Sequence, residues 1–129
     1  MPVLTATPTL GDLLKYELNA NFNRETVVLK GGTSYPLGAV LGKITASAKY
    51  RLSPAAEVVG DEGAEAAVAV LLQAVDASGA DATGLIVARG PVIVSEAALA
   101  FDASVDLTVE KNAKKAELAA VGIVVRATA

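Results

Sequence analysis

The chain has 129 residues, of which 53% are hydrophobic and 19% charged, and its formal net charge is −3. This length suits one domain with one core. Cysteine and histidine are both missing, which excludes disulfides, thiol chemistry and the commonest general base. The negative net charge argues against nucleic acid as the main partner, because phosphate binding needs clustered Lys and Arg.

The apolar stretches are too short to cross a membrane. The longest charge-free stretches, Ala66–Leu72 and Leu118–Val125, fall well short of the roughly 20 residues that a spanning helix needs. The N-terminus shows no secretory signal, since it has neither a basic region nor a continuous apolar run. We therefore expect no membrane partner, and a cysteine-free chain suits the cytosol.

The N-terminal part begins with ten residues rich in Thr and Pro, which predict an extended arm. From Leu14 to Asn23, even positions are apolar or small and odd positions are polar. This period of two is typical of a strand with one buried face. A helix is the alternative at the beginning, because four leucines share one helical stripe: Leu10, Leu13, Leu14 and Leu18. The two Asn that follow, and Phe22 off that stripe, favour the strand.

Short apolar runs separated by Gly and Pro predict the remaining strands. They are Thr26–Leu29, Ala39–Ile44, Lys49–Leu52, Ala66–Val75, Gly84–Arg89, Pro91–Val94, Val105–Val109 and Ile123–Arg126. Gly42 indicates a bulge or a close backbone approach. One helix is expected over Asn112–Val121, with Asn112 as its cap and Gly122 at its end. We predict a β-dominated α+β domain over residues 24–129, preceded by an arm over residues 1–23.

Little in the sequence points to catalysis or to a metal site. Five carboxylates fall in Gly- and Ala-rich linkers and are interpreted as parts of solvated loops: Asp61, Glu62, Glu65, Asp76 and Asp81. The Asp76-x-Ser78 spacing offers oxygen ligands, but it lacks the repeated acids and closing Glu of an EF-hand loop. No residue marks a Ser–Lys pair. We predict no enzyme activity, no cofactor and no small-molecule substrate.

The densest basic cluster lies in the expected helix and comprises Lys111, Lys114 and Lys115. Asn112 and Ala113 interrupt it. We interpret the cluster as the solvated start of the helix rather than as a phosphate-binding patch.

Several segments, in order along the chain, carry a resemblance to a known family. They are Leu10–Glu17, Asn21–Leu29, Tyr35–Lys43, Ala67–Asp76, Val87–Val92 and Leu118–Ile123. Together they are similar to the bacteriophage head decoration proteins of the lambda type. The chain departs from the lambda-type protein in two ways: it lacks aromatic residues which that protein has, and its N-terminal region differs. No trimer contacts are therefore carried over.

The resemblance implies a homotrimer on the outside of the expanded phage head, at three-fold positions. Such a protein binds neighbouring major capsid proteins and stabilises the head against internal DNA pressure. The resemblance also implies a compact β-clip-like fold, an N-terminal arm that reaches the capsid, and assembly in the host cytoplasm. The alternative is another β-rich virion component, such as a tail or neck part, or a non-catalytic binding module.

The alternating segment suggests how an arm would bind. Ten extended residues span about 33 Å, enough to reach a neighbouring sheet and add a strand to its edge. The residues expected to bind the capsid are Leu10, Leu13, Leu14, Tyr16, Leu18, Phe22 and Arg24, with Leu14, Tyr16, Leu18 and Phe22 on the buried face. In the other interpretation, the segment is an edge strand of its own domain.

Overall fold

The structure, a computed structural model, describes residues 10–127. Ten strands, three α-helices and one 3-10 turn form in this range. In chain order they are α1 (Leu10–Leu13), β1 (Leu14–Glu17), α2 (Ala20–Asn23), β2 (Arg24–Leu29), β3 (Thr33–Tyr35), β4 (Val40–Lys43), β5 (Tyr50–Leu52), β6 (Ala67–Leu71), β7 (Val75–Ala77), β8 (Ala82–Val87), β9 (Val92–Ser95), the 3-10 turn (Glu96–Ala98), α3 (Thr108–Ala120) and β10 (Ile123–Arg126). The β-dominated single domain with its helix near the C-terminus is therefore confirmed.

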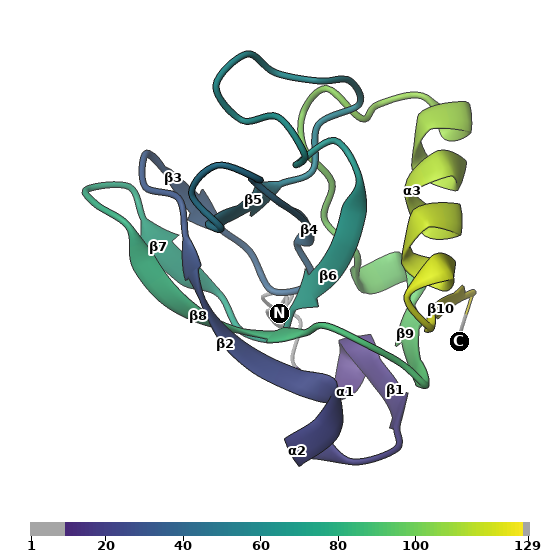
Figure 1. Cartoon of the computed structure of the whole chain (residues 1–129). Coiled ribbons are helices and arrows are strands. Elements are labelled where there is room, and N and C mark those ends of the chain that lie inside the picture. The colour runs from purple at the N-terminus through teal and green to yellow at the C-terminus, as the bar shows by residue number, and fades with distance from the viewer. Residues whose placement is uncertain (1–9, 128–129) are drawn as a thin grey trace, which may run out of the picture.

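Five strands close into a barrel in the order β2-β5-β4-β6-β8 (Figure 1). β2 pairs with β8 along its whole length, from Arg24 opposite Val87 to Leu29 opposite Ala82. On its other side, the register between β2 and β5 consists of one pair, Leu29 with Tyr50, among the described residues. The barrel wall is therefore continuous on the β8 side of β2 and parted along most of the β5 side.

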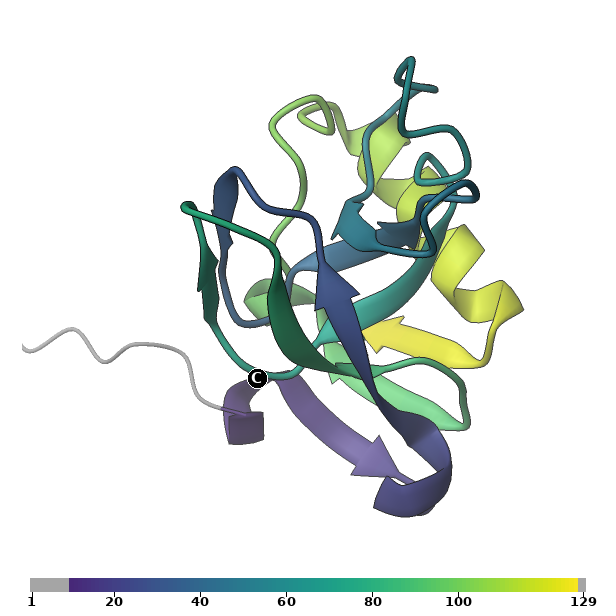
Figure 2. The same ribbon diagram turned by 60° about the vertical axis from the view of Figure 1, so that its left-hand side comes forward.

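A three-stranded sheet brings together the two ends of the described chain. β9 lies in its middle, with β1 antiparallel on one side and β10 parallel on the other. α3 packs against β10 and β6, beside the barrel in Figures 1 and 2. β3 and β7 pair separately as a two-stranded sheet. Because β1 is an edge strand, one side of its backbone has no strand partner among residues 10–127.

Two groups of buried side chains form the core. The group between α3 and the sheets includes Leu13, Val92, Leu118 and Ile123, all at most 1% exposed. The group inside the barrel includes Leu29, Tyr35, Leu41 and Ile86, all at most 2% exposed. Burial of these apolar side chains is the main favourable contribution to folding.

Most of the predicted strands are confirmed, because β-branched runs and turn residues mark them clearly. The run Ala66–Val75 is the exception in the middle of the chain, since β6 ends at Leu71 and β7 begins at Val75. The expectation for Gly42 is confirmed. The register with β6 shifts between Leu41 and Gly42, and a Cβ on Gly42 would lie 1.9 Å from the Ala64 carbonyl oxygen.

The strand predicted over Val105–Val109 is wrong, because α3 begins at Thr108. The backbone N–H of Leu107 donates to the Glu110 carboxylate at 3.2 Å, which is a contact typical of a helix start. Apolar and polar residues alternate over Val105–Val109 as they do in a strand, so the sequence pattern did not indicate that a helix begins at Thr108.

The predicted cap at Asn112 is therefore also wrong, since that residue lies inside α3. The predicted end is confirmed. Gly122 has a φ of +86° and its N–H donates to the Ala119 carbonyl oxygen at 3.0 Å. A positive φ at this position favours glycine.

The single strand predicted over Leu14–Asn23 is wrong as well. β1 covers Leu14–Glu17, and a one-turn helix, α2, replaces the second half. A further one-turn helix, α1, precedes it. β1 is an edge strand of its own domain, as the alternative interpretation held, and residues 10–23 pack onto that domain. The first nine residues of the expected arm lie outside the described residues.

No helix between residues 10 and 127 combines the length and the apolarity needed to cross a membrane.

Candidate functional site

The chain turns sharply between β1 and β2, and we call residues Glu17–Arg24 the corner. Asn19 caps α2, its side-chain oxygen accepting from the Asn21 N–H at 2.9 Å. The Asn19 N–H donates to Asn23 Oδ1 at 2.7 Å, and Asn23 Nδ2 donates to the Arg89 carbonyl oxygen at 2.9 Å. Asn23 is fully buried. One end of this buried amide therefore closes the corner on itself, and the other end holds the corner onto the loop after β8.

Two arginines reinforce the corner. Arg24 donates to both carboxylate oxygens of Glu17, at 2.8 and 2.9 Å, and this hydrogen bonding raises the pKa of Arg24. Arg89 donates to the Phe22 carbonyl oxygen at 2.6 Å and to Glu25 at 3.0 Å. The Arg89 guanidinium also lies 5.7 Å from the centroid of the Phe22 ring, within cation–π range. The backbone of the corner is thus fixed before any partner arrives.

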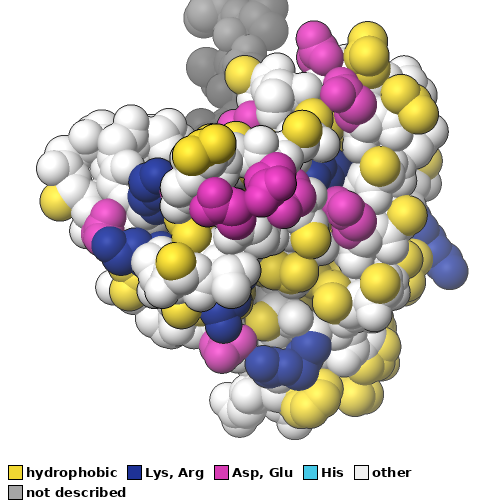
Figure 3. Space-filling model, turned by 45° about the horizontal axis from the view of Figure 1, so that its top comes forward, with side chains coloured by type: hydrophobic (Ala, Val, Ile, Leu, Met, Phe, Trp, Pro, Cys, Tyr) yellow, Lys and Arg dark blue, Asp and Glu magenta, His cyan; other side chains and the backbone are white. Residues whose placement is uncertain are grey.

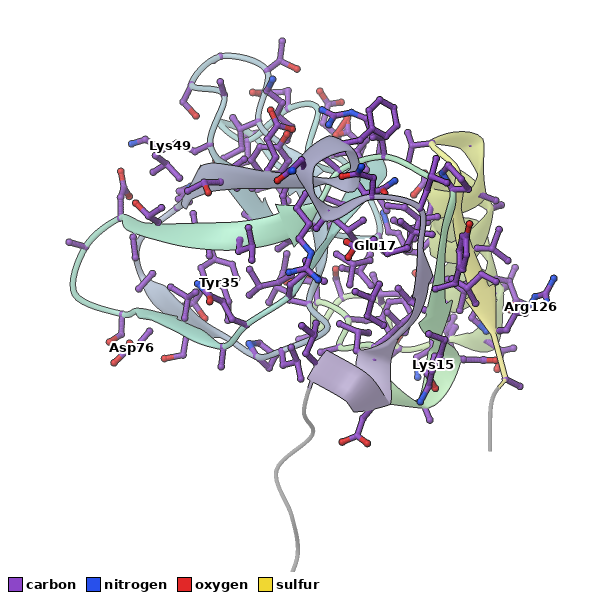
Figure 4. All side chains as sticks on the ribbon, turned by 90° about the horizontal axis from the view of Figure 1, so that it is seen from below. Lys15, Glu17, Tyr35, Lys49, Asp76 and Arg126 are labelled. Carbon is purple, nitrogen blue, oxygen red and sulfur yellow. The ribbon has the colours of Figure 1, made fainter. Side chains whose placement is uncertain are left out.

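This rigid frame displays apolar side chains to solvent. Tyr16 at the end of β1 is 46% exposed, Leu18 is 57% exposed, and Phe22 on α2 is 52% exposed. Hydrophobic side chains lie beside basic ones at the lower edge of Figure 3. In Figure 4, Lys15, Glu17 and Arg126 lie on one side of the molecule, whereas Lys49 and Asp76 lie on the opposite side. Exposed apolar groups within a polar frame are typical of a protein-binding surface.

The structure divides the seven residues predicted to bind the capsid into two groups. Leu10 and Leu14 are partly buried and pack against the core, and Leu13 is wholly inside it. The exposed group consists of Tyr16, Leu18 and Phe22, which remain candidates for a contact surface, and Arg24 frames them. The sequence pattern missed Asn19, Asn23 and Arg89, which position this group. Closely spaced Asn residues were the available signal, because Asn side chains bond nearby backbone groups.

Asp61 is buried rather than part of a solvated loop, which corrects the interpretation from sequence. It is 5% exposed, and its carboxylate accepts from Lys30 at 2.7 and 2.8 Å and from Arg51 at 2.8 Å. These bonds, that from Lys30 first, lower the pKa of Asp61. Tyr35 supports Lys30 by donating to its carbonyl oxygen at 2.6 Å, and burial raises the pKa of Tyr35 to about 12.

The other four candidate carboxylates also accept hydrogen bonds, Glu62 and Glu65 from nearby backbone and Asp76 and Asp81 partly from distant segments. Glu62 accepts from the Gly60 N–H and Glu65 from the Gly63 N–H. Asp76 accepts from Ser78 and Ser34, and Asp81 accepts from the Gly31 N–H and pairs with Lys49. These hydrogen bonds lower the pKa values of Glu62, Asp76 and Asp81. Between residues 10 and 127, no group of three His, Cys, Asp or Glu side chains is placed to hold a metal ion.

Lys114 is 3% exposed, so the interpretation of its cluster as a solvated helix start is wrong for this residue. Its ammonium donates to Ser53 Oγ at 2.9 Å and to the Glu65 carbonyl oxygen, and it lies 3.4 Å from Glu117. The Ser53 hydroxyl in turn donates to the Ala64 carbonyl oxygen at 2.7 Å. The serine proton thus points away from the lysine, and the pair fastens α3 to the loop before β6 rather than activating a nucleophile.

The domain is a β-rich scaffold whose rigid corner displays apolar side chains, which is the organisation of a protein-binding structural part. The family model of the bacteriophage lambda head decoration protein D matches residues 3–123, so the chain belongs to this family. A search of curated proteins found no match. The family consists of structural capsid proteins rather than enzymes, and membership assigns the chain a decorating role on the capsid of a phage virion.

Proposed function

We propose that this protein is a homotrimeric cement protein that binds the outer surface of the expanded head at three-fold positions. It holds neighbouring major capsid proteins together against the pressure of packaged DNA, after assembly in the host cytoplasm. Membership of the decoration protein family supports this proposal. The observation that carries it furthest is the preorganised corner, with Tyr16, Leu18 and Phe22 exposed on a hydrogen-bonded frame.

The corner supplies a mechanism for capsid binding. Covering a half-exposed apolar side chain contributes about 1 kcal/mol, so three of them contribute about 3 kcal/mol before the costs of association. Because the frame is already ordered, little further ordering is needed. The open edge of β1 can also pair with an extended segment of the capsid protein.

Trimerisation would turn this weak contact into a strong one. Three corners on one trimer act together, and linking binding sites in this way raises the apparent affinity about 10²–10⁴-fold. A trimer seated across three capsid subunits would also resist their separation. Cementing thus follows from multivalency rather than from one strong interface.

The corner can be tested with the double variant Leu18→Asp/Phe22→Asp. We expect its binding to expanded, undecorated heads to fall at least tenfold in a sedimentation assay, because two carboxylates would be buried against the capsid. The matched control is Leu107→Asp/Val109→Asp, which changes two exposed apolar residues around the start of α3 and should bind normally. Full binding by the corner variant would refute the assignment of the contact surface.

The oligomer and the stabilising role need separate measurements. Native mass spectrometry should give a trimer, and a chain that stays monomeric at high concentration would contradict the proposal. Decorated heads should retain their DNA at temperatures at which undecorated heads lose it. Immature heads should not bind the protein.

Removal of residues 1–23, the whole arm expected from the sequence, would delete β1 and the buried Leu13. That variant would lose part of the core, so a loss of binding would not identify the contact surface. Removal of residues 1–9 is the informative truncation, because every described element is kept.

A further inference from the structure

The parted side of the barrel forms a hollow of about 380 Å³, which we call the slot. One wall is β2, and the other is the turn between β4 and β5. The lining residues are Glu25, Thr26, Val27, Val28, Lys43, Ser47, Ala48, Lys49 and Tyr50. Ala48 in this turn has a φ of +62°, which is uncommon for a residue other than glycine. Strained backbone of this kind is concentrated at binding and functional sites.

The slot contains groups that have no partner among residues 10–127. The Lys30 N–H donates to the Tyr50 carbonyl oxygen at 2.8 Å, so the N–H groups of Val28 and Thr26, two and four residues earlier, point to the same open side. Tyr50 is 9% exposed, and its hydroxyl has no hydrogen bond within the described range. Lys43 is exposed and forms no ion pair there. The slot therefore offers backbone donors, a phenol and the positive charge of Lys43, while the carboxylate of Glu25 in its lining is paired with Arg89.

A second surface has the opposite properties. Residues Glu57–Val59, which we call the tip, belong to the loop between β5 and β6. Val59 is 95% exposed, Val58 is 36% exposed, and Glu57 is exposed without an ion pair in the described part of the chain. This loop rises at the upper end of Figures 1 and 2, away from the corner, and acidic side chains gather across the upper part of Figure 3.

The loop behind the tip is held firmly. The Asp61 N–H donates to the Val58 carbonyl oxygen at 2.9 Å, and the Gly60 N–H donates to the Glu62 carboxylate. The buried Asp61 carboxylate ties this turn to β5 and to the end of β2 through Arg51 and Lys30. A nearly fully exposed valine on a fixed loop loses little conformational entropy when it is covered, which favours binding.

We infer that the tip of one copy occupies the slot of a second copy. This inference rests on the proposed trimer and assigns its interface. Val59 would cover the exposed Val28, and the Glu57 carboxylate would meet the free ammonium of Lys43 and the hydroxyl of Tyr50. Tip and slot are different surfaces, so each copy uses both. Such a heterologous contact closes into a ring of three when successive copies are related by a rotation of one third of a turn. The contact uses no residue of the corner, which stays available to the capsid.

Charge reversal tests the inference. Lys43→Glu and Glu57→Lys should each raise the concentration at which the trimer dissociates at least tenfold, because like charges would meet. The double variant Lys43→Glu/Glu57→Lys should return within about threefold of the wild type, since opposite charges meet again. The control pair, Arg126→Glu and Asp106→Lys, changes exposed charges elsewhere and should leave dissociation unchanged. Circular dichroism verifies that each variant is folded.

Cysteine cross-linking gives an independent readout, since the chain has no cysteine. Differently tagged Val28→Cys and Val59→Cys chains, co-expressed and oxidised, should form a covalent dimer that carries both tags. Each variant expressed alone should form none. Self-cross-linking of Val59→Cys would place the tips together at the symmetry axis and overturn the inference.

The outcomes separate the interface from the proposed function. A wild-type trimer that charge reversal leaves intact, with no cross-link between Val28→Cys and Val59→Cys, would refute the tip-and-slot interface alone. A wild-type chain that is monomeric at every concentration would refute the proposed trimer and this interface with it. Loss of the trimer in both single variants, with recovery in the double variant, would establish the contact.

Discussion

The corner and the tip loop are irregular segments at opposite ends of the molecule, and both present exposed hydrophobic side chains. They are held by different chemistry. A neutral, fully buried amide, Asn23, anchors the corner. A buried carboxylate with two cationic partners, Asp61 with Lys30 and Arg51, anchors the tip loop. The comparison shows that one fold can hold two exposed apolar surfaces with different anchoring side chains. A substitution at one anchor can therefore weaken its own surface and leave the other surface in place.

The largest effect is expected from removing the ionic anchor. Asp61→Ala leaves Lys30 and Arg51 without their shared carboxylate, and breaking a buried charge pair of this kind costs about 3 kcal/mol. The free energy of unfolding, measured with urea, should fall by about that amount. Capsid binding through the corner should persist at temperatures where the variant is folded.

The control for this substitution is Asp106→Ala, which removes an exposed carboxylate. Its unfolding free energy should stay within about 0.5 kcal/mol of the wild type. If Asp61→Ala behaved like this control, the ionic anchor would have no role in stability.

The second effect concerns the amide anchor. Asn23→Ala removes two hydrogen bonds and leaves the Asn19 N–H and the Arg89 carbonyl oxygen without a partner, which costs about 2 kcal/mol. We also expect weaker binding to heads, because Leu18 and Phe22 would lose their fixed positions. The exposed Asn21→Ala is the matched control. Unchanged head binding by a destabilised Asn23→Ala would show that the corner needs no fixed geometry.

The smallest effect is a difference in the response to acid. Lys30 and Arg51 lower the pKa of Asp61, so its contribution to stability is fully present above the unfolded value of about 3.9 and is lost as the pH falls through the folded pKa. The two hydrogen bonds of the Asn23 side-chain amide, with the Asn19 N–H and the Arg89 carbonyl oxygen, involve no titratable group. Hydrogen exchange below pH 4 should therefore show the amides of the tip loop opening before the Asn19 N–H, which donates to the Asn23 side chain. Equal loss of protection in both regions would contradict the distinction.

The strands were predictable because their signal is local. Thr26–Leu29 and Ile123–Arg126 are β-branched runs bounded by turn residues, and both form strands. The alternation of apolar and polar residues predicted strands wrongly at two places where a polar side chain binds a nearby backbone N–H. Asn19 caps a helical turn inside the apparent ten-residue strand. Glu110 accepts from the Leu107 N–H at the start of α3, which begins inside the apparent strand over Val105–Val109.

The anchors were not predictable, because their partners lie far away in the chain. Lys114 meets Ser53, 61 residues earlier, and Asp61 meets Lys30, 31 residues earlier. In the sequence, Asp61 lies between glycines and Lys114 follows an alanine. Charged residues beside such small residues are usually exposed to solvent. Only the folded topology brings the partners together. For the corner, the alternating pattern identified Tyr16, Leu18 and Phe22 as candidates, whereas the roles of Asn23 and Arg89 required the structure.

The position of β9 between β1 and β10 has a consequence for the timing of biosynthesis. The central strand is flanked by residues 14–17 on one side and residues 123–126 on the other. This sheet cannot be completed on the ribosome until nearly the whole chain has been made, and such long-range pairing is slow to form. The corner extends directly from β1. A chain that stops before residue 123 therefore lacks β10, and the corner then extends from a strand whose sheet is unfinished.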